Sequence, residues 1–341
     1  MSFAATLTNT AERVRLPDPL LRLGISSLVG RTRRSLAKTP ESTVTFAQGM
    51  AAYPIALHTS DANRQHYELP PEFFGLILGP RRKYSCALYP TGNETLAEAE
   101  DHALEETIAH AALGDGQHIL ELGCGWGSLS LFMAERFPQA RITAVSNSAP
   151  QRGYIEARAR LKGLRNLRVI TADMNSFTPE GQFDRVVSVE MFEHMANWRE
   201  LLGRVRGWLK PSGRLFLHVF AHAGSPYRFN HEDEADWIAR HFFTGGIMPS
   251  HDLAASFPDL FTLERDWRWP GTHYARTARD WLENYDAHAV QIRGLLAEVY
   301  GAEAAVWERR WRLFFLATEG LFGHGGGRHW GVSHYRLAPV P

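Results

Sequence analysis

The chain has 341 residues, and its 37 Lys and Arg are balanced by 37 Asp and Glu, so the formal net charge at pH 7 is zero. Hydrophobic residues make up 44% of the chain and charged residues 22%, which is typical of a globular protein. The zero net charge gives no electrostatic reason to expect a nucleic acid partner. Only two cysteines occur, which argues against a disulfide framework and a cysteine-based zinc site, and no metal is expected.

The sequence contains no apolar run that approaches the roughly 20 residues needed to span a bilayer. Its first residues include several arginines but lack the apolar segment of a signal peptide. A cytoplasmic protein without a transmembrane segment is therefore expected.

Residues 1–112 predict a mainly helical segment. Pro17-Asp18-Pro19 precedes a periodic apolar run, and Thr95 begins a helix that is expected to extend towards Leu113. Glu98 follows Thr95 by three residues, which is the spacing of a capping box.

Residues 113–222 alternate between short apolar strands and amphipathic helices. This alternation predicts parallel βαβ units and an α/β fold, with helices on both faces of a doubly wound sheet. Ligands of such a sheet bind at the carboxyl ends of its strands, near the switch point. The expected strands are His118–Leu122, Arg141–Val145, Leu167–Ile170, Phe183–Val189 and Arg214–Val219, and the expected helices are Ser128–Phe137, Gln151–Leu161 and Trp198–Leu209.

The remaining sequence divides into two parts. Residues 223–260 are rich in His, Asp and aromatic residues and predict an inserted helical lid. Residues 261–341 are expected to complete the sheet and the acceptor pocket. They predict strands at Phe261–Trp267 and Val332–Leu337, with helices around Trp281 and Trp311.

The first expected strand leads into a glycine-rich loop. Gly123, Gly125 and Gly127 allow the backbone to turn tightly and approach a ligand without an intervening Cβ. Such a loop alone is weak evidence, since NAD, FAD and phosphate sites also use one. This Gly-x-Gly-x-Gly spacing differs from the dinucleotide pattern and lacks the ending of a P-loop.

Polar residues follow the next two strands. Asn147 follows the second strand, where this fold class meets ribose hydroxyls and usually carries a carboxylate. Asp173 and Met174 follow the third, where a carboxylate can accept from an adenine amino group and Met can cover the ring. Asp173 alone would equally suit a helix cap. Together with the loop, these residues predict S-adenosylmethionine (SAM) as cofactor and a Rossmann-like class I SAM methyltransferase fold.

Several separated motifs resemble the cyclopropane fatty acid synthase superfamily of SAM-dependent methyltransferases. The resemblance covers roughly residue 65 to the end of the sequence and is closest to the coclaurine N-methyltransferase-like branch. It rests on Tyr84-Ser85-Cys86, Leu122–Gly127, Val189–Met195, Arg240–Gly246, Met248-Pro249-Ser250, His273-Tyr274-Ala275 and Val332-Ser333-His334.

The resemblance implies a role for each matching cofactor residue. Tyr84 and Ser85 would contact the methionine portion of SAM together with the glycine loop. Asn147 and Gln151 would hold the ribose side, and Asp173 and Met174 the adenine. A homodimer is a further expectation that the resemblance carries.

The group Glu190, Glu193 and His194 follows the fourth strand and is expected to face the SAM methyl group. If the chain turns helical there, Glu190 and His194 are four residues apart and share a face. The pair suits an amine, because Glu190 can orient an ammonium group and His194 can remove its proton. The alternative is that Glu193 and His194 only cap a helix or satisfy each other in the core.

The leading hypothesis is therefore SAM-dependent N-methylation of a small aromatic or alkaloid-like amine. Four aromatic residues are expected to cover the ring of this acceptor, or a fatty acyl tail: Phe242, Phe243, Trp267 and Trp330. A small-molecule amine or lipid is thus the expected partner.

A rival hypothesis is methyl or methylene transfer to an unsaturated acyl chain, with bound bicarbonate as base. Matching the bicarbonate site of the synthases to this sequence gives Cys86, Glu193, His218 and Tyr274. Glu190 stands where the synthases carry glycine, which favours the amine. A non-catalytic binding module is a third hypothesis, and the intact glycine loop with Glu190 argues against it.

Overall fold

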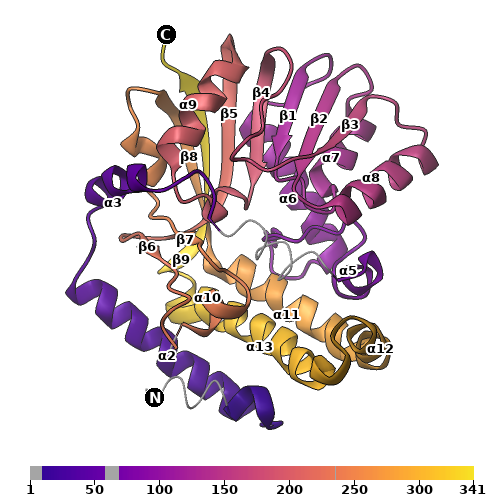
Figure 1. Ribbon diagram of the computed structural model, residues 1–341, viewed down its shortest axis with the longest axis vertical. Helices are drawn as coiled ribbons and strands as arrows, with labels where there is room; N and C mark the ends of the chain where they lie inside the picture. The colour runs from indigo at the N-terminus through magenta and orange to yellow at the C-terminus, as the bar shows by residue number, and fades with distance from the viewer. Residues whose placement is uncertain (1–9, 58–68, 235) are drawn as a thin grey trace.

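The computed structural model describes residues 10–57, 69–234 and 236–341. Within these residues, seven strands form one sheet in the order β3-β2-β1-β4-β5-β9-β8 (Figure 1). The first five strands of the chain are parallel, and β9 runs antiparallel to both β5 and β8. The strands are β1 (His118–Leu122), β2 (Arg141–Ser146), β3 (Leu167–Thr171), β4 (Phe183–Val189), β5 (Leu209–His222), β8 (Phe261–Pro270) and β9 (Trp330–Pro339).

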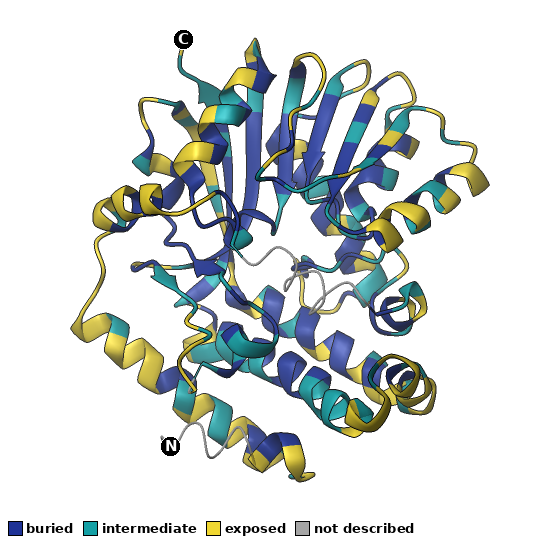
Figure 2. Cartoon of the chain, viewed as in Figure 1, coloured by how far each residue is buried: buried dark blue, intermediate teal, exposed yellow. Residues whose placement is uncertain are grey.

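Helices cover both faces of this sheet, as predicted for a doubly wound fold. On one face lie α6 (Leu96–Ala111), α7 (Ser128–Arg136) and α8 (Ala149–Leu161). On the other lie α9 (Trp198–Trp208), α3 (Thr43–Gly49) and the 3-10 turn η1 (Met50–Ala52). The buried residues form a continuous layer along the central strands (Figure 2).

A second, helical layer lies beyond the carboxyl ends of the parallel strands (Figure 1). Aromatic side chains hold it together: the rings of Trp311 and Phe73 lie 4.9 Å apart, and those of Trp311 and Phe242 lie 5.1 Å apart. Much of the aromatic content therefore forms core. The layer comprises α2 (Asp18–Lys38), α5 (Pro71–Ile77), α11 (Gly271–Ala287), α12 (Ala289–Tyr300) and α13 (Ala304–Gly323), with the 3-10 turns η4 (Gly301–Glu303) and η5 (His324–Gly326).

Local sequence signals set several element boundaries. Thr95 accepts a hydrogen bond from the Glu98 backbone at the start of α6, and Glu98 returns the contact, so the predicted capping box is confirmed. Strand β5 is longer than predicted, because Leu209 already pairs with Phe183 before the register shifts. Residues 210–213, between the predicted helix and the predicted strand, therefore lie within β5.

The segment predicted as a helical lid has little helix. Residues 223–260 contain the ribbon of β6 (Tyr227–Arg228) and β7 (Ile247–Met248), the five-residue helix α10 (Trp237–His241) and the 3-10 turn η3 (Leu253–Ser256). Gly245, with φ of 76°, turns the chain sharply soon after α10 ends. Aromatic side chains of this segment are buried without the periodicity of a long helix.

Among the described residues, we find no helix with both the length and the apolar character needed to cross a bilayer.

Candidate active site

A cavity opens at the carboxyl ends of β1, β2, β3 and β4, as expected for the switch point of this sheet. Its space, including solvent at the mouth, is about 770 Å³. Eight of the described residues that line it were not among the predicted site residues. The lining comprises Ala56, Leu57, Gly123, Gly125, Val145, Ser146, Asn147, Gln151, Ala172, Asp173, Met174, Glu190, Met191, His194, Met195 and Thr244.

The three glycines of the loop all have positive φ, but they serve different purposes. A Cβ on Gly123 would lie 2.5 Å from Met191, and one on Gly127 would lie 2.6 Å from Ile155, so both positions are closed by packing. A Cβ on Gly125 would meet no atom within 4 Å, although Gly125 lines the cavity. Gly125 therefore leaves space that a ligand can fill.

The opposite wall carries polar groups suited to the ribose and adenine of SAM. Gln151 is 1% exposed; its Oε1 accepts a hydrogen bond of 2.6 Å from Ser146 Oγ, and its Nε2 has no partner among the described residues. An unsatisfied buried donor facing a cavity fits a ligand hydroxyl or carboxylate. Asn147, Asp173 and Met174 also line the cavity at the predicted strand ends. The residues present thus fit the cofactor.

Tyr84 and Ser85 are not among the described residues that line the cavity. The Tyr84 ring packs 5.4 Å from that of Phe74. The Ser85 Oγ accepts a hydrogen bond from the buried Lys83 ammonium, which also donates to the Cys86 carbonyl. Their predicted contact with the methionine portion of SAM stays a prediction.

Glu190 lies at the floor of the cavity with its carboxylate held from three sides. Its Oε1 accepts a hydrogen bond from the Cys86 backbone N–H (2.9 Å) and lies 3.2 Å from His218 Nε2, which donates or accepts according to its tautomer. Its Oε2 accepts a 2.6 Å hydrogen bond from the Tyr274 hydroxyl. Burial raises the pKa of Glu190, against the opposing influence of the Lys83 charge.

The expectation that Glu190 and His194 share one helical face is wrong. Glu190 has φ of 49°, in the left-handed region, and only Phe192–His194 form a 3-10 turn, η2. A non-glycine residue in this region carries strain of about 1–3 kcal/mol, which its contacts here must offset. Both side chains nevertheless line the same cavity.

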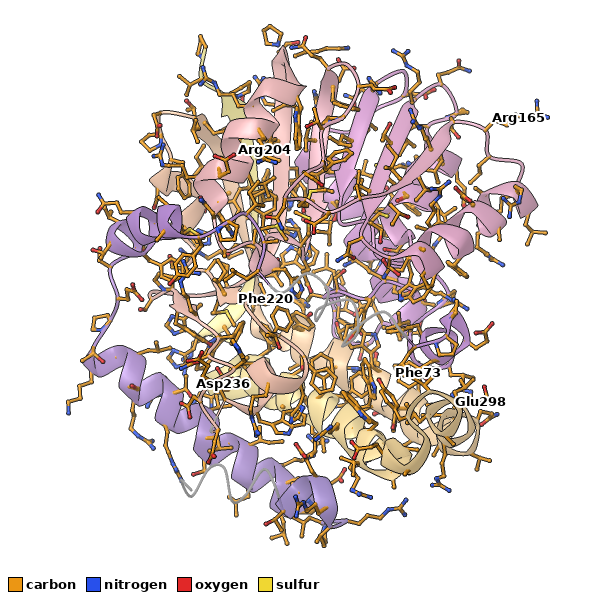
Figure 3. All side chains as sticks on the ribbon, in the orientation of Figure 1. Phe73, Arg165, Arg204, Phe220, Asp236 and Glu298 are labelled. Carbon is orange, nitrogen blue, oxygen red and sulfur yellow. The ribbon has the colours of Figure 1, made fainter. Side chains whose placement is uncertain are left out.

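His194 lies flat against Phe243, with ring centroids 4.4 Å apart and planes inclined by 16°. The aromatic surface continues to Phe220, whose ring lies 5.3 Å from that of Phe243. Phe220 lies centrally, between the sheet and the helical layer (Figure 3). Further along, Tyr274 stacks on Phe322 at 4.3 Å. A wall of rings thus leads from His194 to the hydroxyl that contacts Glu190.

Glu193, predicted as catalytic, is fully buried and is not among the described residues that line the cavity. Its Oε1 accepts a 2.6 Å hydrogen bond from the Phe220 backbone N–H. Burial, and secondly the charge of Glu190, raise the pKa of Glu193 well above its usual value. A neutral carboxyl that supports β5 from behind is consistent with these contacts, and a catalytic role stays a prediction.

Phe242 and Trp330 lie in the core instead of on the cavity wall. Phe242 stacks on Phe314 at 4.5 Å, and the indole N–H of Trp330 donates to the Tyr227 hydroxyl. Both residues are at most 1% exposed, because other parts of the protein already cover their rings. The ring of Phe243 contacts His194, a residue of the lining, and the ring of Phe220 packs against Phe243.

Glu121, at the end of β1, supports the glycine loop and gives a test of the fold. Its buried carboxyl accepts a hydrogen bond from Ser130 Oγ, and burial raises its pKa to about 8. Between about pH 4.5 and 8 the folded chain therefore keeps a proton that the unfolded chain has released, and stability falls as pH rises, by up to ~1.4 kcal/mol per pH unit. We expect Glu121→Gln to reduce this decline, measured by denaturant unfolding at successive pH values.

The exposed Glu298 provides the control (Figure 3). Glu298→Gln should reproduce the wild-type pH dependence of stability. An unchanged pH slope in Glu121→Gln would show that Glu121 is already ionised in the folded protein at neutral pH.

Comparisons with known proteins identify the family of this chain. Residues 57–326 match the family described as mycolic acid cyclopropane synthetase. An (S)-coclaurine N-methyltransferase of Thalictrum flavum subsp. glaucum is 33% identical over 296 residues, covering 85% of this chain and 82% of the relative. A cyclopropane-fatty-acyl-phospholipid synthase of Escherichia coli K12 is 31% identical over 225 residues, covering 65% of this chain and 56% of the relative.

A solved structure resembles the whole fold. The crystal structure of coclaurine N-methyltransferase bound to N-methylheliamine and S-adenosylhomocysteine (SAH) gives a TM-score of 0.93 at 29% identity, covering 98% of this chain and 99% of that one. The family match, the relatives and the shared architecture all include the glycine loop and the Glu190 region. The chain therefore belongs to the mycolic acid cyclopropane synthetase family of SAM-dependent methyltransferases.

Proposed function

We propose that this enzyme transfers the methyl group of SAM to the nitrogen of a small aromatic, alkaloid-like amine. The observation that carries the proposal is the Glu190 carboxylate at the floor of the cofactor cavity. The similarity to (S)-coclaurine N-methyltransferase, over most of both chains, supports the same substrate class.

Glu190 has the capacity to bind one more donor. A carboxylate offers about four acceptor positions, and Cys86, His218 and Tyr274 occupy three of those on Glu190. Because Glu190 also lines the cavity, an ammonium group of the acceptor can take the remaining position. His194, on the same cavity wall, can take a second N–H of a secondary ammonium.

The aromatic wall suits the rest of such an acceptor. Phe243, Phe220 and Phe322 form a row of rings from His194 to Tyr274, stacked at its two ends and T-shaped between, with neighbouring centroids 4.3–6.2 Å apart. Rings of this kind stack on an aromatic ligand and attract a cation over their faces. An amine attached to an aromatic ring system would use both interactions.

The chemistry requires an aligned, uncharged nitrogen. SAM supplies an activated methyl group on a sulfonium centre. Glu190 and His194 would hold the amine in line with it and remove one N–H proton, which frees the nitrogen lone pair. Alignment of this kind can lower a barrier by about 7–11 kcal/mol.

The position of Glu190 also weighs against the acyl-chain hypothesis. Three of the residues matched to the bicarbonate site of the synthases contact the Glu190 carboxylate: the Cys86 N–H and the Tyr274 hydroxyl donate to it, and the His218 ring lies 3.2 Å from it. A carboxylate of the protein thus occupies the donors that a bound bicarbonate would need. This arrangement supports a resident base, fixed to the chain, in place of a dissociable one.

The test uses methyl-labelled SAM with two acceptor panels, secondary aromatic amines and unsaturated phospholipids, followed by mass spectrometry. We expect labelled N-methyl products from the amine panel and no labelled lipid. Labelled cyclopropane or methyl groups in the lipid panel alone would overturn the proposal. Calorimetric titration with SAH tests the remaining alternative, because a binding module without cofactor affinity would give no heat at high micromolar concentration.

A further inference from the structure

Three histidines connect Glu190 to a carboxylate at the protein surface. The His218 ring contacts Glu190 Oε1 through Nε2 (3.2 Å) and His334 Nε2 through Nδ1 (2.8 Å). The His334 Nδ1 lies 2.8 Å from His110 Nδ1. The His110 Nε2 lies 3.0 Å from Glu106 Oε1. Both nitrogens of every ring are therefore used in one unbroken row.

The fold fixes this row across one face of the sheet. His218 on β5 and His334 on β9 are direct partners in the antiparallel ladder, and both are fully buried. His110 and Glu106 lie one turn apart on α6, which packs over these strands. The Glu106 side chain is 41% exposed. The row thus leads from the floor of the cavity to solvent on the α6 side of the sheet.

The surroundings keep the three rings neutral. Burial, followed by the Lys83 charge, lowers the pKa of His218 well below its usual value. Burial and the neighbouring His218 do the same to His334. The pKa of His110 falls to about 4 through burial and, secondly, through Arg265 and Arg336.

A neutral imidazole has one N–H donor and one free nitrogen acceptor. Each ring in the row can therefore receive a proton on one nitrogen while it gives one up from the other. Four contacts join the five groups Glu190, His218, His334, His110 and Glu106. Each contact holds one proton, and the three ring protons and one carboxyl proton supply them. The row has two complete arrangements, with the carboxyl proton either on Glu190 or on Glu106.

We propose that His218, His334 and His110 relay the proton released during methyl transfer from Glu190 to Glu106 at the surface. The inference rests on the proposed function, in which Glu190 receives a proton from the acceptor. A relay is useful there because the acceptor and the cofactor together would separate Glu190 from solvent in the cavity.

Each transfer conserves protons and charge. Before the transfer, the ring protons lie on His218 Nδ1, His334 Nδ1 and His110 Nε2, so His218 Nε2 can accept. The O–H bond of Glu190 breaks as an Nε2–H bond forms on His218, whose Nδ1 proton passes to His334 Nε2. The His334 Nδ1 proton passes to His110 Nδ1, and the His110 Nε2 proton passes to the Glu106 carboxylate and then to water. No ring keeps an additional proton at the end. After product leaves, protons move along the row in the opposite direction, from Glu106 to Glu190. Glu190 then releases its proton to solvent in the cavity.

His334→Gln tests the relay, because an amide can keep a hydrogen bond but cannot pass a proton between two nitrogens. We expect kcat for amine methylation to fall about 10-fold or more, less than the 10²–10⁴ expected for losing a proton-transfer group itself. The KM and the SAH affinity should stay within about twofold, and the solvent deuterium isotope effect on kcat should rise. His110→Gln, near the surface end, should act in the same direction.

The control is His251, another buried histidine of the β9 side. It contacts Ser333 Oγ (2.8 Å) and Asp266 Oδ2 (2.7 Å), and neither contact leads to Glu190. His251→Gln should leave kcat and its isotope effect unchanged. Wild-type kcat and isotope effect in both His334→Gln and His110→Gln, or an equal loss in His251→Gln, would overturn the relay.

A spectroscopic measurement separates failure of the relay from failure of the proposed function. In protein with ¹⁵N-labelled histidine, Glu190→Gln should change the tautomer of His110, two rings away, and the change should disappear in the His334→Gln background. This readout needs no acceptor. A shift at His110 without any amine methylation would uphold the connection and reject the proposed function, whereas an unmoved His110 would reject the relay.

Discussion

Replacing Gly125 by Val should abolish binding of SAM and SAH. Gly125 has φ of 51°, lines the cavity and has no atom within 4 Å of the position of its Cβ. A β-branched residue in this conformation carries about 1–3 kcal/mol of strain, and its side chain would occupy space left for the cofactor. We expect the Kd for SAH, measured by calorimetry, to rise about 100-fold or more, equivalent to ~3 kcal/mol.

Gly181 separates the loss of space from the backbone strain. It has φ of 79°, no atom within 4 Å of its Cβ position and an exposed location in the loop before β4. Gly181→Val should carry the same backbone strain and lower the free energy of unfolding by about 1–3 kcal/mol. Its SAH affinity should stay at the wild-type value. If Gly125→Val still bound SAH as tightly as Gly181→Val, the cofactor would not lie against the loop.

The sheet and the cofactor wall were predictable because their signals are local. Each parallel strand is a short apolar run, and a residue that follows such a run lies at the carboxyl edge of the sheet. Asn147 and Asp173 could therefore be placed on one wall from their positions in the sequence alone. The glycine loop is equally local, since Gly123, Gly125 and Gly127 differ from one another only in what lies opposite them.

The acceptor side was predicted less completely, because its geometry depends on distant parts of the chain. The left-handed conformation of Glu190 has no local signal, and its three donors come from three separate regions of the sequence. Composition also did not show that Phe242 and Trp330 pack against other parts of the protein. The same aromatic residue types build both the core and a ligand wall, and only the packing distinguishes them.

The histidine row lies furthest from what sequence reasoning can reach. His110 and His334 are 224 positions apart, and His334 and His218 are 116 positions apart. The contact between His218 and His334 depends on the register of β5 with β9. A shift of one residue would turn one of the two side chains to the opposite face of the sheet. His334 lay within a motif of the resemblance, but no property of that motif indicated its neighbours.

Replacing Glu190 by Gln should lower kcat for amine methylation by about 10²–10⁴, the range expected for loss of a positioned proton acceptor. The amide keeps the volume of the carboxyl group and can still accept from the Cys86 N–H and the Tyr274 hydroxyl. It cannot attract an ammonium group by charge or take its proton. SAH affinity, measured by calorimetry, should therefore stay within about threefold of the wild type, because the glycine loop and the Gln151 wall are unchanged.

Glu121→Gln gives the matched control, since it also converts a buried carboxyl to an amide, in strand β1 of the same sheet. The pKa of Glu121 is raised to about 8, so at pH 7 this carboxyl is largely neutral and its exchange removes little charge. Its kcat should match the wild type at that pH, while Glu190→Gln is slow. A Glu190→Gln enzyme that binds SAH poorly would assign Glu190 to cofactor binding. One that methylates amines at the wild-type rate would show that the nitrogen loses its proton elsewhere, and the carboxylate at the cavity floor would then serve only to hold Cys86, His218 and Tyr274 in place.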